Sequence, residues 1–362
     1  MGRPADLRSG LAGPHQPPHN PLVGLELRTP LCEALGIEYP IVCAGFGSAA
    51  VPELAAAVSN AGGLGVLGAS GMEPGEIQRR IANTRKLTRL PFGINFIIAE
   101  EGDEDRSFLL DQMAMATAEH VALVVLFWGD PAPYVERARG TGVKVFIQVG
   151  SVAEAKSAAD AGVDGVIAQG IEAGGHVRGT TSIWDLLPAT IKAIDPVPVL
   201  ASGGIGDGAG VARALRAGAQ GVSLGTRFVA SDEAWLHPAY KLRIVQSSAQ
   251  DTVLNELYDV WWPGAPHRTL RNKTFAEWDA AGRPPTGERP GEGTSIGKRT
   301  IWNGERADWP RYAIGTAPPD FDGDIEYAPL WAGESCTVVN DIKPAIEIVR
   351  DLVRDAEAAL RG

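Results

Sequence analysis

Two glycine-rich stretches of the chain have the composition of a phosphate-binding site. Residues 201–208 (ASGGIGDG) follow an apolar run and precede a helical segment, and residues 225–227 (GTR) end the next apolar run. Consecutive glycines expose backbone N–H groups, and a phosphate is favoured there by hydrogen bonds and by a following helix dipole. The alternative is a pair of glycine-rich turns without a ligand; we favour a phosphate because the stretches follow successive apolar runs. The residues expected at this site are Ser202, Gly203, Gly204, Gly225 and Thr226.

A histidine ends a third glycine-rich stretch, QGIEAGGH. Gly174 and Gly175 would let the backbone approach a flat ligand closely. His176 could then take up a proton or stabilise an anion. A lone histidine is usually structural, but this one follows an apolar run as the phosphate candidates do, so we favour a catalytic role. Glu172 would either brace the loop or pair with Arg178.

A short repeat indicates which elements position these residues. The pattern Ala-Gly-x-x-Gly-Val occurs at residues 61–66, 161–166 and 217–222, each time after an alanine-rich helical segment and before a short apolar run. A helix that ends at a left-handed glycine and turns into a buried strand explains the pattern. The first copy also contains GLGVLG, but a dinucleotide fingerprint leaves a strand and enters a helix, so we reject that interpretation. Repeated helix-to-strand units predict parallel strands with helical crossovers.

Eight segments qualify as strands, and helical segments separate most of them. They are residues 40–44, 65–69, 92–97, 121–128, 143–149, 165–169, 197–202 and 221–228. Eight parallel strands predict a (β/α)8 TIM barrel, with an open doubly wound sheet as the alternative. In such a barrel the loops that follow the strands share one face, which would bring the glycine-rich stretches and His176 together.

The rest of the chain suggests an insertion into this barrel. After the eighth strand the βα rhythm stops, and residues 342–360 carry the apolar stripe of a closing helix. We therefore expect residues 1–28 to be a disordered tail, 29–230 and 336–362 to form the barrel, and 231–335 to form a lid-like insertion after strand 8. Trp261 and Trp262 in the insertion suit either packing beneath the lid or a partner surface.

Composition excludes several classes of protein. The 362 residues carry a net charge of -11, which argues against nucleic acid or an anionic membrane surface as partner. The longest apolar run, residues 121–128, is far shorter than the ~20 residues of a membrane span. The three cysteines share no CxxC spacing, so no metal site is expected, and a cytoplasmic location fits. Glycine is unusually frequent: its 44 residues among 362 are about 12% of the chain, against a usual share of about 7%.

The motifs together resemble the nitronate monooxygenase family, flavoproteins formerly called 2-nitropropane dioxygenases. The likeness runs from about residue 29 to residue 360. It rests on residues 52–67, 91–95, 168–176, 201–208 and 221–228, with a further similar segment at 258–272. The order and spacing of these segments make the resemblance specific, whereas one of them alone would be weak.

The resemblance implies a TIM barrel that binds FMN, with the phosphate on the glycine-rich residues named above. Around the flavin and its ribityl chain it implies Asn95, Gln148, Gln169 and Gly174, with Gly45 and Phe46 near the ring. His176 matches the family's active-site histidine, which takes a proton from a neutral nitroalkane or helps to hold an anionic nitronate. The flavin then takes one electron from the nitronate, and O2 completes its conversion to a carbonyl compound and nitrite. The expected partners are a small-molecule substrate and O2, with a homodimer as the assembly.

Two departures from the family pattern bear on the substrate. Phe46 stands where many members have the methionine of Ala-Pro-Met, and Val177 separates His176 from Arg178. The superfamily also contains FMN-dependent NAD(P)H:quinone reductases and enoyl-thioester reductases, which stay open as alternatives. A barrel that binds a phosphorylated ligand without redox chemistry is the alternative outside the enzymes.

Overall fold

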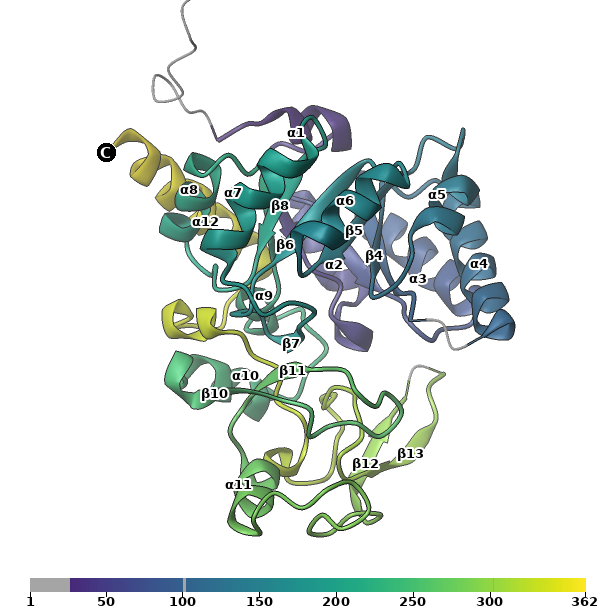
Figure 1. Ribbon diagram of the computed structural model, residues 1–362, viewed down its shortest axis with the longest axis vertical. Helices are drawn as coiled ribbons and strands as arrows, with labels where there is room; N and C mark the ends of the chain where they lie inside the picture. The colour runs from purple at the N-terminus through teal and green to yellow at the C-terminus, as the bar shows by residue number, and fades with distance from the viewer. Residues whose placement is uncertain (1–26, 100–101, 302) are drawn as a thin grey trace, which may run out of the picture.

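Eight parallel strands form the central sheet of the computed structural model, which describes residues 27–99, 102–301 and 303–362 (Figure 1). In chain order they are β1 (Ile41–Cys43), β2 (Gly65–Gly68), β3 (Phe92–Ile97), β4 (Leu123–Phe127), β5 (Lys144–Val149), β6 (Gly165–Gln169), β8 (Val199–Ser202) and β9 (Gly221–Leu224). The spatial order is β1-β9-β8-β6-β5-β4-β3-β2. The prediction for residues 1–28 falls almost wholly outside the described residues.

The two ends of this sheet meet, so it is a barrel and not an open doubly wound sheet. A parallel bridge joins Val42 of β1 to Leu64, directly before β2. The Leu64 N–H donates to the Ile41 carbonyl, and the Cys43 N–H donates to the Leu64 carbonyl, both at 2.9 Å. The predicted TIM-barrel class is therefore confirmed.

One predicted strand is too long. Residues 221–228 were expected to form a single strand, but β9 ends at Leu224 and a short helix, α9 (Thr226–Val229), follows Gly225. The Phe228 N–H donates to the Gly225 carbonyl instead of to a neighbouring strand. Phe228 and Val229 remain buried in the helix, so an apolar run alone could not distinguish the two structures.

Helices cover the outside of the barrel. They are α1 (Pro30–Leu35), α2 (Pro52–Asn60), α3 (Pro74–Leu87), α4 (Asp103–Ala118), α5 (Ala132–Ala138), α6 (Val152–Asp160), α7 (Ile183–Ile194), α8 (Gly208–Arg216) and α12 (Ala345–Arg361). The expected closing helix is α12, which packs against α8 (Figure 1). Val349, Leu352 and Ala356 are buried on its inner face, whereas Ile346 is only partly buried.

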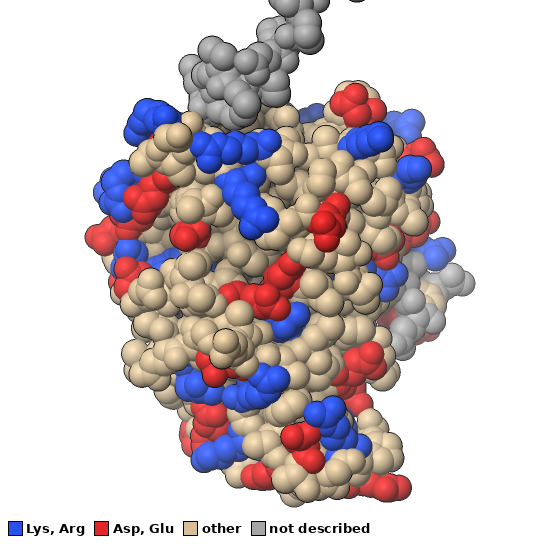
Figure 2. Space-filling model, turned by 60° about the vertical axis from the view of Figure 1, so that its left-hand side comes forward, with Lys and Arg blue, Asp and Glu red and all other residues tan. Residues whose placement is uncertain are grey.

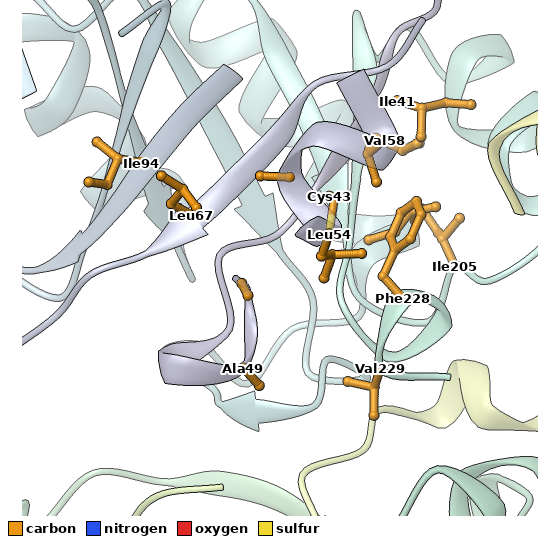
Figure 3. Packing of buried hydrophobic residues seen from close by; sticks show 14 of the residues in the cluster. Ile41, Cys43, Ala49, Leu54, Val58, Leu67, Ile94, Ile205, Phe228 and Val229 are labelled. Carbon is orange, nitrogen blue, oxygen red and sulfur yellow. The ribbon is translucent and has the colours of Figure 1, made fainter. Parts of the chain in front are cut away.

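The barrel interior is filled from the amino ends of the strands. Leu64, Leu123, Phe146 and Leu200 belong to one buried cluster, and Leu31 of α1 packs into the same cluster. A second and larger layer lies between the strands and the helices. Figure 3 shows part of that layer around β1, α2 and α9. Because the barrel interior is packed at the amino end, the space at the barrel mouth lies at the carboxyl end.

Between α9 and α12 the chain forms a separate group of elements on the lower side in Figure 1. These are α10 (Pro238–Val245), β10 (Thr252–Asn255), β11 (His267–Leu270), α11 (Lys273–Ala280), β12 (Ser295–Thr300) and β13 (Arg306–Pro310). Strands β12 and β13 form a hairpin, and β10 and β11 pair antiparallel. The division at residues 231–335 and the lid role stay predictions.

The repeated motif uses its two glycines differently. The first glycine of each copy is left-handed, with φ of 92° at Gly62, 86° at Gly162 and 96° at Gly218, as the helix-capping interpretation predicts. The second glycine allows close packing. A Cβ added to Gly65 would lie 2.0 Å from the Ala55 carbonyl oxygen of α2. In this copy the first glycine therefore shapes the turn, and the second allows β2 to approach α2 closely.

Acidic and basic side chains are interspersed on the face in Figure 2, without a continuous basic area. Within the described residues, no helix combines the length and apolar character needed to cross a membrane.

Gly65→Ala should destabilise the barrel by about 3 kcal/mol, because the new methyl group would collide with the backbone of α2. Gly75→Ala in α3 is the matched control, since a Cβ there meets nothing within 4 Å. It should leave the free energy of unfolding unchanged or raise it by up to about 1 kcal/mol. Urea denaturation measures both variants, and equal losses of stability would contradict the packing argument.

Candidate active site at the barrel mouth

A cavity of about 620 Å³ lies at the carboxyl ends of the strands. Its floor includes Val42, Val66 and Val125, which top the packed barrel interior. The structure brings every site residue named from the sequence to the wall of this one cavity. They are Gly45, Phe46, Asn95, Gln148, Gln169, Gly174, Gly175, His176, Ser202, Gly203, Gly204, Gly225 and Thr226. Their individual roles remain predictions.

The two phosphate candidates form neighbouring parts of the wall. Gly203 and Gly204 are both left-handed, with φ of 97° and 68°, and their N–H groups donate to no described protein acceptor. A Cβ added to Gly225 would meet nothing within 4 Å, so open space lies beside this residue. Free N–H groups beside open space are what a bound phosphate requires.

The dipole of helix α8 contributes less to phosphate binding here than the sequence suggests. Helix α8 begins only at Gly208, and the Asp207 carboxylate accepts the Gly210 N–H at 2.8 Å. A carboxylate therefore already caps this helix. The loop N–H groups remain as the donors for an anion. The Thr226 hydroxyl accepts the Gly333 N–H at 2.9 Å, which ties this wall to the segment before α12.

His176 is held by a strand that the sequence did not predict. Residues Gly175–His176 form β7, which pairs antiparallel with β11 of the insertion, so that His176 lies opposite His267. The Gln169 amide donates to the His176 carbonyl at 2.8 Å and accepts the Arg178 N–H at 3.0 Å. Gln169 was expected to meet the flavin. In the structure its side chain supports the histidine loop from within the cavity wall.

Tryptophans enclose the His176 imidazole. The ring centroid of Trp262 lies 4.1 Å away, that of Trp331 lies 5.4 Å away, and Trp128 meets the imidazole edge-on at 6.2 Å. Trp262 therefore packs against the histidine within the site, whereas Trp261 is 63% exposed. Sequence reasoning missed Trp128 and Trp331, since neither stands in a motif.

Burial controls the charge of His176. Its Nε2 atom is buried without a hydrogen-bond partner among the described residues. Desolvation, together with the nearby His267, lowers the pKa of His176 to about 3. The imidazole is thus neutral at physiological pH, and Nε2 has no partner in the described part of the protein.

The neighbouring His267 is fully satisfied. The Tyr258 N–H donates to its Nε2 at 3.2 Å, so Nδ1 carries the proton and donates to the Ala265 carbonyl at 2.9 Å. Burial lowers the pKa of His267 to about 4. Because both nitrogens are engaged, His267 acts as a neutral scaffold for β11 and is not a second base.

Glu172 braces the loop, which was one of its two expected roles. Its carboxylate accepts the Ser182 hydroxyl and the Ile183 N–H, at the first turn of α7. The other expected partner, Arg178, pairs instead with Glu154 at 2.7 Å and lies over the Trp128 ring. Glu172 therefore fixes the segment that leads to His176 and does not enter the chemistry.

Fold and site together define the class of protein: a (β/α)8-barrel enzyme with a glycine-walled cavity and an enclosed histidine at the carboxyl ends of its strands. The family described as nitronate monooxygenase matches residues 28–355. The chain belongs to the nitronate monooxygenase family and is an oxidoreductase, as the resemblance in the sequence implied.

Three relatives illustrate the range of the family. A nitronate monooxygenase of Pseudomonas aeruginosa is 31% identical, over 91% of this chain and 98% of the relative. The (3aS,4S,5R,7aS)-5-hydroxy-7a-methyl-1-oxo-octahydro-1H-indene-4-carboxyl-CoA dehydrogenase of Mycobacterium tuberculosis is 30% identical, over 92% and 97%. FabK of Thermotoga maritima has a similar structure, with a TM-score of 0.74 and 31% identity over 93% and 98% of the two chains.

His176→Asn should flatten the dependence of stability on pH. The folded pKa of about 3 lies below the unfolded value of 6.5, so the unfolded chain binds the proton first. The stability from the neutral histidine is complete above pH 6.5 and is lost between pH 6.5 and 3, by up to about 1.4 kcal/mol per unit. Urea titrations at pH 7 and 4.5 measure this loss, which should be smaller in the variant. His120→Asn, at an exposed position, should behave as the wild type, and three parallel profiles would contradict the assignment.

Proposed function

We propose that this protein is an FMN-dependent oxidoreductase of the nitronate monooxygenase type. It would oxidise alkyl nitronates, and nitroalkanes after deprotonation, to a carbonyl compound and nitrite with O2. The observation that carries the proposal is one cavity that combines free glycine N–H groups with an unpartnered, buried imidazole nitrogen. Family membership supports the same conclusion.

The described residues fit an FMN group. The N–H groups of Gly203 and Gly204 and the open space at Gly225 suit its phosphate, and Asn95 and Gln148 line the cavity where its ring system would lie. When bound, the flavin would supply the redox chemistry by taking electrons from the substrate and passing them to O2. The chain itself would bind the substrate, orient it and move protons.

His176 would act on the proton of a neutral substrate. Its neutral imidazole can accept a proton from the carbon next to a nitro group, which leaves an imidazolium beside a nitronate. The two opposite charges stabilise each other in a cavity with little water. A substrate that is already a nitronate needs no such base, so His176 would contribute to binding alone.

We propose that residues 231–335 act as a lid. Trp262, on this segment, encloses His176 from above the barrel, and Arg268 Nε donates to the Ile171 carbonyl of the histidine loop at 3.1 Å. Closing the cavity in this way would keep water from the reacting atoms. Small-molecule substrate and O2 are the partners that this arrangement supports, and a homodimer remains our prediction for the assembly.

Because one of the relatives is named a carboxyl-CoA dehydrogenase, a redox reaction other than nitronate oxidation is the second candidate function. Anaerobic addition of ethyl nitronate to the yellow holoprotein should bleach the flavin, whereas NADH should hardly do so. Bleaching by NADH alone would assign a reductase function. A colourless protein that takes up no FMN would favour the non-redox barrel.

His176→Asn should separate the two kinds of substrate. Turnover of neutral nitroethane should fall by about 10²–10³-fold, because general-base catalysis is lost. Turnover of ethyl nitronate should fall by less than about tenfold, since that substrate has no proton to remove. Steady-state kinetics at one pH measure both values, and each substrate serves as the control for the other. Equal losses would remove the base role.

Gly225→Asp should weaken FMN binding without disturbing the fold. The position has room for a side chain, and a carboxylate there would repel the phosphate. Gly225→Asn has nearly the same shape but no charge, so it is the matched control. Fluorescence titration of the apoprotein should show an FMN Kd at least about tenfold weaker in the aspartate variant than in the asparagine variant. Equal affinities would place the phosphate elsewhere.

A further inference from the structure

The cavity wall carries one side chain of fixed charge among the described residues, Arg299 of β12. No Asp, Glu or Lys shares the wall. Most buried or half-buried arginines of this protein pair with a carboxylate, as Arg227 does with Asp341 and Arg289 does with Asp259. No described carboxylate pairs with Arg299. A cation that faces a cavity and has no counter-ion in the protein can still pair with a negatively charged ligand.

The guanidinium of Arg299 is held in place by neutral groups. It lies over the ring of the fully buried Trp309, 3.9 Å from the centroid, and Nη1 donates to the Thr316 carbonyl at 3.0 Å. Desolvation lowers the pKa of Arg299 to about 10, so the group is still cationic at neutral pH. Stacking and one hydrogen bond fix its plane while other N–H groups stay free, which is the arrangement that binds a carboxylate or a similar oxyanion.

A continuous set of contacts connects Arg299 to the histidine. Trp331 packs against His176, and its Nε1 donates to the Gly315 carbonyl at 2.5 Å. The next residue, Thr316, accepts the hydrogen bond from Arg299. The wall that contains Arg299 and His176 also includes the apolar side chains of Trp261, Ile301 and Ile314. A ligand with an apolar body and an anionic group would therefore match both the apolar side chains and the guanidinium.

We propose that Arg299 is a specificity-determining residue that selects organic anions as substrates. The negative group pairs with the guanidinium, and the apolar part packs against Ile301 and Ile314. The inference rests on the proposed function for the reaction at His176. The anion can be the reacting nitronate itself or a second group, such as a carboxylate, elsewhere on the substrate. Both sources share the chemistry of an oxyanion that meets a fixed cation.

The test compares a charged probe with an uncharged probe of the same shape. Calorimetry of the FMN-loaded protein with hexanoate and hexanamide should show tighter binding of hexanoate. Arg299→Gln should weaken hexanoate binding by about tenfold or more and leave hexanamide unchanged. Lys298→Gln is the matched control, because it removes the same charge from the adjacent, exposed position of β12. Arg299→Lys should retain part of the preference.

A second arm identifies the source of the anion. If Arg299→Gln raises the KM for ethyl nitronate as well, the guanidinium pairs with the reacting group; if only hexanoate binding suffers, it pairs with a remote one. Two results would overturn the proposal: an unchanged hexanoate preference in Arg299→Gln, or a lower flavin content than in Lys298→Gln, which would assign Arg299 to the FMN phosphate. Hexanoate binding needs no turnover. A protein that binds hexanoate through Arg299 but leaves nitronates unoxidised would therefore reject only the proposed reaction.

Discussion

The pairing of β7 with β11 is the interaction on which the candidate site depends. It joins a two-residue strand that follows β6 of the barrel to a strand that lies some ninety residues later in the chain. The pairing fixes the backbone of His176, brings Trp262 and Trp331 around its ring and thereby removes water from Nε2. The lowered pKa of the histidine is a consequence of this enclosure and not of any residue beside it in the sequence.

The barrel and the inserted elements contribute different chemistry to one cavity. The barrel contributes backbone N–H groups, from the left-handed Gly203 and Gly204 after β8, and open space beside Gly225 after β9. The insertion contributes side chains, namely aromatic rings and the guanidinium of Arg299. Backbone donors suit an invariant group such as a cofactor phosphate, whereas side chains on an insertion can change without harm to the barrel.

Much of the barrel could be predicted because its signals are local. Left-handed glycine caps, alanine-rich helices and apolar runs each extend over fewer than ten residues, and the eight strands follow from them. The predictions were wrong where two structures bury the same residues. Phe228 is buried whether residues 225–229 continue a strand or turn into α9, so its hydrophobicity cannot decide between them. The sequence likewise could not show that Asp207 caps α8, because this role depends on the residue at which the helix begins.

The sequence by itself determined the barrel and the family, and it indicated that the glycine-rich stretches and His176 lie together at the barrel mouth, because motifs after successive parallel strands must share one face. Only the tertiary structure decided the burial, the hydrogen bonds and the charge pairing of those residues. The support of His176 by Gln169, the bracing role of Glu172 and the unpaired charge of Arg299 depend on side-chain contacts that no motif in the sequence specifies. Whether a side chain is buried, and whether it has a counter-ion, depends on its position in the folded protein. Both are decided only when the insertion folds against the barrel.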